Sequence, residues 1–142
     1  MIGVPKVSLQ LSRNKEITQC LESLATECDM PVALLTILGE RLKYVRGKHA
    51  FSVQVSDVYY SFLSRTEPEL YMLNHIQWPL PGTEQYKESM PTWLQFYAGL
   101  PLITSTGLFL GSICVMDHQP GRLSVSQQEL LRQTADRILT LL

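Results

Sequence analysis

The 142-residue sequence lacks any hydrophobic run near the roughly 20 residues that a membrane-spanning helix requires. The first residues, 1–6, lack the charged start and apolar stretch typical of a signal peptide. No long run of Lys or Arg occurs, and the formal net charge is -1. These absences argue against a membrane protein and against binding to nucleic acid or an anionic membrane. A cytoplasmic location is therefore the default expectation.

Cysteine is also scarce, with only Cys20, Cys28 and Cys114. An odd number of cysteines at wide spacing forms neither a disulfide framework nor a Cys-x-x-Cys pair. Cys20 and Cys28 are eight residues apart, so on a helix they would lie two turns apart and could not be bridged. We expect three reduced thiols, mostly buried.

Histidine offers no metal site, because His49, His75 and His118 are scattered and no two stand at ligand spacing on one element. The sequence contains no Gly-x-Ser-x-Gly nucleophile motif and no Gly-rich loop followed by Lys. We therefore expect no bound metal and no cofactor.

What is present is an ordinary globular composition, with 45% hydrophobic and 18% charged residues. The length suits one domain with one core. We expect a lead-in over residues 1–13 and a single domain over residues 14–142.

Two segments have helical periodicity. Residues 14–29 are predicted as a helix with Asn14 as its cap, which ends before Pro31. Its apolar stripe consists of Ile17, Leu21, Leu24 and Cys28. Residues 125–142 are predicted as the last helix, which starts near Ser124 to Ser126 and has a capping box from Ser126 to Glu129. Its stripe consists of Leu131, Ala135, Ile138 and Leu142, widened by Leu130 and Leu141.

Other segments are apolar and shorter. The segments predicted as strands are 32–38, 42–47, 69–73, 94–104 and 108–117. Residues 32–38 are apolar throughout, except for one Thr, which suits a strand covered on both faces. The segments 94–104 and 108–117 flank a turn at 105–107, which suits a hairpin. Residues 57–65 could form a short helix.

The stretch 74–93 has no clear periodicity and contains several prolines together with Trp78, Tyr86 and Trp93. An irregular segment of this length is usually functional or mobile.

Residues 96–102 read Phe-Tyr-Ala-Gly-Leu-Pro-Leu, and residues 110–117 read Leu-Gly-Ser-Ile-Cys-Val-Met-Asp. Together with Thr104, Gly107 and the loop at 120–123, these segments resemble the GAF family in order and spacing. The resemblance implies an α+β fold with a profilin-like central antiparallel sheet of about five to six strands. It also implies terminal helices on one face, long loops or short helices over the other, and a dimer formed through the 14–29 and 125–142 helices.

Within this signature we expect mostly structural roles. Gly99 and Gly111 should allow close approach of backbone or bulky neighbours. Pro101 indicates an edge position or a bulge. Asp117 should accept backbone hydrogen bonds in the turn that follows it.

The chemistries of known GAF subclasses are not apparent. Bilin-binding members attach the chromophore to a cysteine beside a histidine, and no histidine here has an adjacent cysteine. The Phe-Asp-Glu of cyclic-nucleotide-binding members is missing, and 74–93 has no cysteine of the kind that methionine-sulfoxide-reducing members use. Residues 61–63 and 78–83 also differ from related domains. We expect no enzymatic activity.

If a small molecule binds, the resemblance places it under the long loop. The expected ligand-contacting residues are Tyr71, Asn74, His75, Trp78, Tyr86, Trp93 and Cys114. The alternative is that these aromatic residues belong to the hydrophobic core and only cover the second face of the sheet. The leading hypothesis is a sensory or regulatory domain in signal transduction that binds an unidentified small molecule, dimerises, or does both. The alternatives are a ligand-free interaction and dimerisation module, and a small redox enzyme of the sulfoxide-reductase kind.

Overall fold

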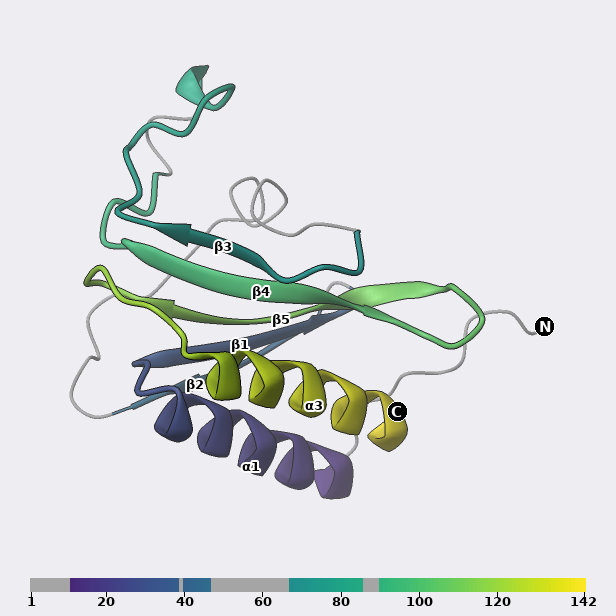
Figure 1. The fold of residues 1–142 in the computed structure, drawn as a ribbon. Coiled ribbons are helices and arrows are strands. Elements are labelled where there is room, and N and C mark those ends of the chain that lie inside the picture. Colours follow the sequence, from purple (N-terminus) through teal and green to yellow (C-terminus); the bar gives the residue numbers. More distant parts are fainter. Residues whose placement is uncertain (1–10, 39, 47–66, 86–89) are drawn as a thin grey trace.

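The computed structural model describes residues 11–38, 40–46, 67–85 and 90–142. In this part of the chain an antiparallel sheet has the strand order β2-β1-β5-β4-β3. The strands are β1 (Val32–Ile37), β2 (Glu40–Val45), β3 (Tyr71–Asn74), β4 (Phe96–Ile103) and β5 (Phe109–Asp117). The helices α1 (Leu11–Glu27) and α3 (Val125–Leu141) lie side by side on one face of this sheet (Figure 1). The α+β fold expected from the sequence is confirmed.

Each central strand is buried on both faces, because alternate side chains point to opposite sides of a sheet. In β1, Ala33, Leu35 and Ile37 join the apolar cluster that also contains residues of α1 and α3. Val32 and Leu34, from the same strand, join a second apolar cluster on the opposite face. The nearly continuous apolar run of this segment therefore forms a strand covered on both faces, as predicted.

The predicted stripe of α1 is confirmed, since Ile17, Leu21, Leu24 and Cys28 are all buried. The predicted cap is wrong, because α1 begins at Leu11 and so Asn14 lies inside the helix. A good N-cap residue marks a helix start only when no helix-compatible residues precede it, and residues 11–13 continue the helix toward the N-terminus.

Helix α3 starts within the predicted range of residues 124–126, but its capping box differs from the predicted one. Ser124 is the N-cap: its hydroxyl accepts from the Gln127 backbone N–H, and the Gln127 side chain accepts from the Ser124 N–H. The predicted box from Ser126 to Glu129 is therefore wrong, because Ser-x-x-Gln satisfies the same geometry two residues earlier. Glu129 instead pairs with Arg132 at 3.6 Å.

The predicted stripe of α3 faces the interior of the domain, where Leu131, Ala135 and Ile138 are at most 3% exposed. Leu142 is only half-buried and packs at the margin of this core. A dimer contact made by α3 would therefore have to use a different side of the helix.

The strand ends differ from the prediction by at most two residues. Strand β1 stops at Ile37 because Leu38 adopts a left-handed conformation with φ of 49°, and Ile37 pairs with Glu40 across the turn. Strand β3 covers 71–74 rather than 69–73. The β3–β4 pairing ends at Gly99, so Pro101 lies where β4 pairs with β5 alone among the described strands, as expected of an edge position.

Gly111 confirms its predicted role, because a Cβ at this position would collide with the carbonyl of Thr36 on β1. Close contact between β1 and β5 therefore requires glycine here. The predicted helix at 57–65 lies outside the described residues. Within the described ranges, no helix has the length and apolar character needed to cross a membrane.

Candidate functional site

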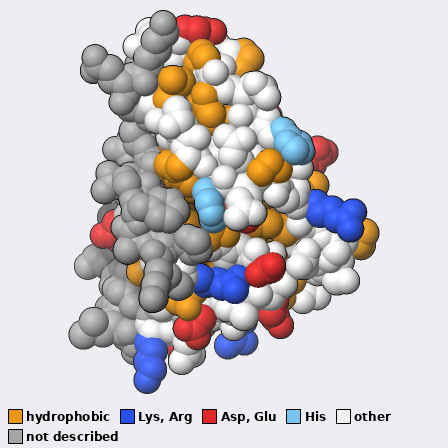
Figure 2. Space-filling view, turned by 90° about the vertical axis from the view of Figure 1, so that its left-hand side faces the viewer, with side chains coloured by type: hydrophobic (Ala, Val, Ile, Leu, Met, Phe, Trp, Pro, Cys, Tyr) orange, Lys and Arg blue, Asp and Glu red, His pale blue; other side chains and the backbone are white. Residues whose placement is uncertain are grey.

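The sheet face opposite the helices carries the second apolar cluster, built from all five strands and the described part of the 75–94 segment. Its buried members are Val32, Leu34, Ile76, Leu94, Tyr97, Cys114 and Met116. Its partly buried members are Val45, Tyr71, Leu73, Trp78, Leu80, Met90 and Trp93. Figure 2 shows hydrophobic side chains gathered in the upper part of the molecule, at the height where this segment extends from the sheet in Figure 1.

Four of the residues predicted to contact a ligand meet in this second cluster. Tyr71 comes from β3, Cys114 from β5, and Trp78 and Trp93 from the two arms of the 75–94 segment. The indole N–H of Trp78 donates to the Leu94 carbonyl at 3.0 Å and so joins these two arms. The structure therefore brings together residues that are more than 40 positions apart in sequence.

The segment also has internal hydrogen bonds that hold its shape. The buried Thr83 hydroxyl donates to the Leu80 carbonyl at 2.6 Å. The Ile76 N–H donates to the Gln95 carbonyl at 3.3 Å, which extends the β3–β4 pairing into the segment. The described part of this segment is consequently folded back on itself, with half-buried tryptophans on the second face.

Tyr97 is the central residue that the sequence analysis missed. It is 1% exposed, and its ring meets that of Tyr71 edge-on with centroids 6.3 Å apart. A Cβ on Gly99 would lie 2.6 Å from the Tyr97 hydroxyl and 2.9 Å from the Cys114 Cβ. The phenol therefore lies directly over Gly99, in space that only glycine leaves open. The signal was available, because residues 97 and 99 share one face of a strand.

The thiol of Cys114 is fully buried, and burial raises its pKa to about 12 although a hydrogen bond with Tyr97 acts in the opposite direction. Burial likewise raises the pKa of Cys28 to about 11, with a further contribution from the charge of Glu27. Because the thiolate is the nucleophilic form, neither thiol is activated for chemistry at neutral pH.

Two other predicted residues lie elsewhere. The exposed Asn74 side chain donates to the Gly121 carbonyl at 2.6 Å and accepts from the Gly121 N–H at 3.1 Å. His75 is exposed and has a φ of 49°. Both side chains are therefore exposed rather than buried beside the second apolar cluster. The predicted residue Tyr86 lies outside the described residues.

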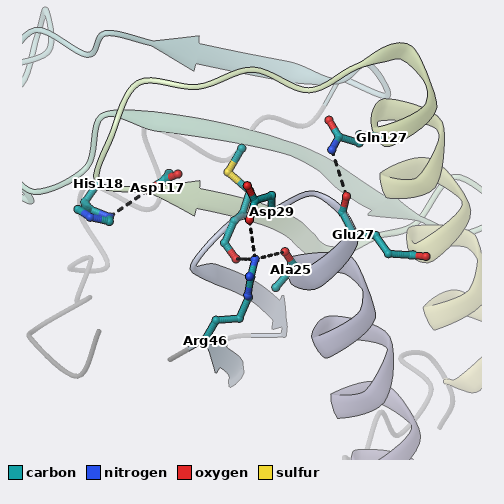
Figure 3. Close-up of polar contacts among 8 residues, drawn as sticks. Ala25, Glu27, Asp29, Arg46, Asp117, His118 and Gln127 are labelled. Atoms are coloured by element: carbon teal, nitrogen blue, oxygen red, sulfur yellow. Dashed lines mark hydrogen bonds and ion pairs between the residues drawn. The ribbon is translucent and has the colours of Figure 1, made fainter. Parts of the chain in front are cut away.

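The end of the sheet below this segment is polar. As predicted, the Asp117 carboxylate accepts the backbone N–H of Gln119, at 3.2 Å, and it also pairs with His118 at 2.9 Å (Figure 3). Arg46 contacts the Asp29 carboxylate at 3.3 Å and donates to the Ala25 carbonyl at 3.1 Å, at the C-terminal end of α1. No group of three metal-ligating side chains occurs among the described residues.

A third feature lies on the far side of the molecule, between the two helices. It is a groove of about 320 Å³ lined by Glu16, Gln19, Cys20, Ser23, Leu130, Gln133, Thr134 and Arg137. Cys20 and Leu130 are half-exposed there. Apart from Thr134, which is buried, these residues lie beside the buried stripes of the helices rather than on them.

No family model matches the chain. A cyclic di-GMP phosphodiesterase of Pseudomonas aeruginosa is 24% identical over 115 residues, which covers 79% of this chain. The chain spans only 19% of the length of that relative.

Solved structures are more similar in shape than in sequence. The GAF domain of the cyanobacteriochrome TePixJ superposes with a TM-score of 0.69 at 10% identity and covers 99% of this chain and 96% of its own. A GAF domain from Synechocystis in its photoproduct state superposes with a TM-score of 0.67 at 8% identity, with coverages of 89% and 90%. The chain therefore has the fold of GAF domains, as the resemblance of residues 96–123 predicted.

Proposed function

We propose that this chain is a sensory domain of a signalling protein and binds a small molecule on the second face of its sheet. The observation that carries the proposal is the second apolar cluster, in which half-buried Tyr71, Trp78 and Trp93 surround buried strand residues. Binding pockets combine such apolar and aromatic walls with a few polar groups. The names of the structural neighbours, among them a cyanobacteriochrome, support a sensory role for this fold.

The lining favours a planar and largely apolar molecule, because aromatic rings stack on flat surfaces and aliphatic groups. We propose that binding is non-covalent, since the raised pKa of Cys114 keeps its thiol protonated at neutral pH. For the same reason we propose that this thiol carries out no redox catalysis and that the chain acts as a regulatory segment. The partial match to a much longer phosphodiesterase is consistent with this role.

Native mass spectrometry of protein purified without refolding tests the proposal first. Extra mass that leaves under mild activation would identify a retained molecule. The variant Trp93→Ala should lose this mass, whereas Phe109→Ala, an exposed position at the opposite end of β5, should keep it. Retention of the molecule by Trp93→Ala would contradict the proposed location.

Tryptophan fluorescence provides the second test, because both tryptophans of the sequence lie in the 75–94 segment. A molecule identified by mass should shift the emission of the wild type and raise its melting temperature, since binding to the folded state alone stabilises it. If a screen of candidate molecules changes neither the emission nor the melting temperature, the sensory proposal is wrong.

A second candidate function, dimerisation, is favoured by the groove between α1 and α3. Half-exposed Leu130 and Cys20 line it, with Glu16 on one helix and Arg137 on the other. Sedimentation velocity should then show a dimer that Leu130→Glu disperses while the circular dichroism spectrum stays folded. A monomeric wild type would exclude this candidate at the concentrations measured.

A further inference from the structure

A row of hydrogen bonds crosses the polar end of the sheet and begins at the last residue of β3. Asn74 holds Gly121 through both backbone groups, with its amide nitrogen 2.6 Å from the carbonyl oxygen and its amide oxygen 3.1 Å from the nitrogen. The same amide oxygen accepts the backbone N–H of His75 at 2.9 Å. One exposed amide thus joins the first residue of the 75–94 segment to the loop that leads into α3.

The row continues into both helices. Ser124 lies three residues after Gly121 in the sequence and caps α3 through its reciprocal hydrogen bonds with Gln127, at 2.8 and 3.1 Å. The Gln127 amide also donates to the Glu27 carbonyl at the end of α1, at 3.1 Å (Figure 3). Between Gly121 and Ser124, Leu123 is buried and accepts from the Gln128 side chain at 3.1 Å, which anchors the loop to the core.

We propose that Asn74 is a positioning residue that couples the 75–94 segment to the N-terminal turn of α3 and, through Gln127, to the C-terminal end of α1. A displacement of the segment at His75 reaches Gly121 through Asn74 and changes how well Ser124 caps α3. The inference rests on the proposed sensory function for its biological meaning. The coupling itself is a property of the folded chain and needs no ligand.

The physical basis is that a helix end depends on a few hydrogen bonds. The first N–H groups of a helix have no partner within the helix, and a cap satisfies part of them. If the loop before Ser124 loses its contact with Asn74, the cap becomes less ordered and the first turn opens more often. Local opening of this kind is visible in amide hydrogen exchange well before global unfolding.

The first experiment compares hydrogen exchange of wild type, Asn74→Ala and Gln77→Ala. Asn74→Ala should raise the exchange rates of the N–H groups of Gln127 and Gln128 about tenfold, the effect expected for loss of one hydrogen-bonding group. The central strands β1 and β5 should keep wild-type rates. Gln77→Ala removes an exposed side-chain amide three residues along the same segment, so its rates at α3 should equal those of the wild type.

A second variant, Asn74→Asp, makes the contact between residue 74 and Gly121 depend on pH. At pH 7 a carboxylate oxygen would face the Gly121 carbonyl, and the two acceptors would repel each other. Near pH 4 the carboxyl group gains a proton that can be donated to that carbonyl. Exchange at Gln127 and Gln128, divided by the wild-type value at the same pH, should therefore be raised at pH 7 and return toward one near about pH 4. The wild-type series, measured at the same pH values, controls for the neighbouring ionisable side chains of His75, His118 and Asp117.

Three results would overturn the inference. Unchanged exchange at α3 in Asn74→Ala would show that the contact between Asn74 and Gly121 does not order the Ser124 cap. A uniform rise over all strands would show a general structural role without coupling. A pH-independent ratio in Asn74→Asp would show that the bond to the Gly121 carbonyl is not the link. Because none of these measurements uses a ligand, failure here is distinguishable from failure to find a bound molecule.

Discussion

The two faces of the sheet bury apolar residues in different ways. On the helix face, Ile17, Leu21, Leu24, Ile113 and Ile138 have no exposed surface, and the cluster is mostly aliphatic. On the opposite face the partly buried outer members include three large aromatic residues, Tyr71, Trp78 and Trp93, and four of the seven outer members lie on the irregular segment. A close-packed aliphatic layer resists change, whereas an irregular layer of large flat side chains can repack around a guest. We therefore expect the helix face to hold the domain together and the opposite face to repack when a molecule binds.

The largest effect is expected on the helix face. Ile138→Ala should lower the free energy of unfolding by about 2–5 kcal/mol, because it leaves a cavity among fully buried side chains. Urea unfolding followed by circular dichroism measures this value. The neighbouring half-buried Leu139→Ala should cost less. Ile138→Glu should unfold the monomer, and a folded but monomeric Ile138→Glu would contradict the burial of this stripe.

The next effect concerns the contact between β1 and β5, which both faces share. Gly111→Ala should destabilise the domain by about 1–3 kcal/mol, since the added methyl group would push the β1 backbone away at Thr36. Gly121→Ala is a matched control, because the nearest atom to its added methyl would be the Met30 Cε at 3.6 Å. Equal melting temperatures for the two variants would argue against close approach at Gly111.

A smaller effect is expected on the second face. Trp78→Phe keeps an aromatic ring but removes the bond to the Leu94 carbonyl, so it should cost about 1 kcal/mol. The loss should appear as faster hydrogen exchange within 76–94, while α1 and β1 keep wild-type rates. If exchange rises equally in α1, the two faces unfold together and do not differ in local stability.

The smallest effect on stability at neutral pH concerns the thiols. Iodoacetamide at pH 8 should label the half-exposed Cys20 alone in the native protein and all three cysteines in urea, as intact mass spectrometry would show. Rapid labelling of Cys114 would indicate that the second face opens readily.

The raised thiol pKa values also predict the alkaline behaviour. The folded state holds the protons of Cys28 and Cys114 up to about 11 and 12, against a reference of 9.0. Their contribution to stability is therefore complete below about pH 9 and is lost as the pH rises through those values. Melting temperatures measured from pH 7 to 11 should show the onset of this loss above about pH 9, and Cys28→Ala should weaken it.

Much of the fold could be predicted because periodicity reflects burial directly. The stripe from Ile17 to Cys28 is buried as its pattern indicated. The apolar run predicted at 32–38 is buried through Ile37, apart from the half-buried Thr36, whereas Leu38 is exposed. The signature at 96–117 was predicted together with the roles of Gly111 and Asp117. Ends of elements were less predictable, because Ser124 and Ser126 are both competent caps and only the loop before α3 selects one.

The candidate site was partly predictable for a similar reason. Large aromatic residues on an irregular segment left a ligand pocket and hydrophobic core both open, and Trp78 and Trp93 lie with Tyr71 and Cys114 in one cluster. Nothing local in the sequence indicates that Asn74 turns away to hold Gly121, 47 residues later. Long-range partners of this kind depend on which strand ends meet at one edge of the sheet.

By itself, therefore, the sequence determined the buried stripes of α1 and α3, the approximate extent of the described helices and strands, and the apolar character of β1 on both faces. Only the tertiary structure decided that Cys114 of β5 meets Tyr97 over Gly99 and that Asn74 bonds to the loop before α3. It also decided that the stripe of α3 belongs to the core of the domain. The physical reason is that hydrophobic burial follows from each residue and its spacing, whereas a directional contact exists only once distant segments are held in place.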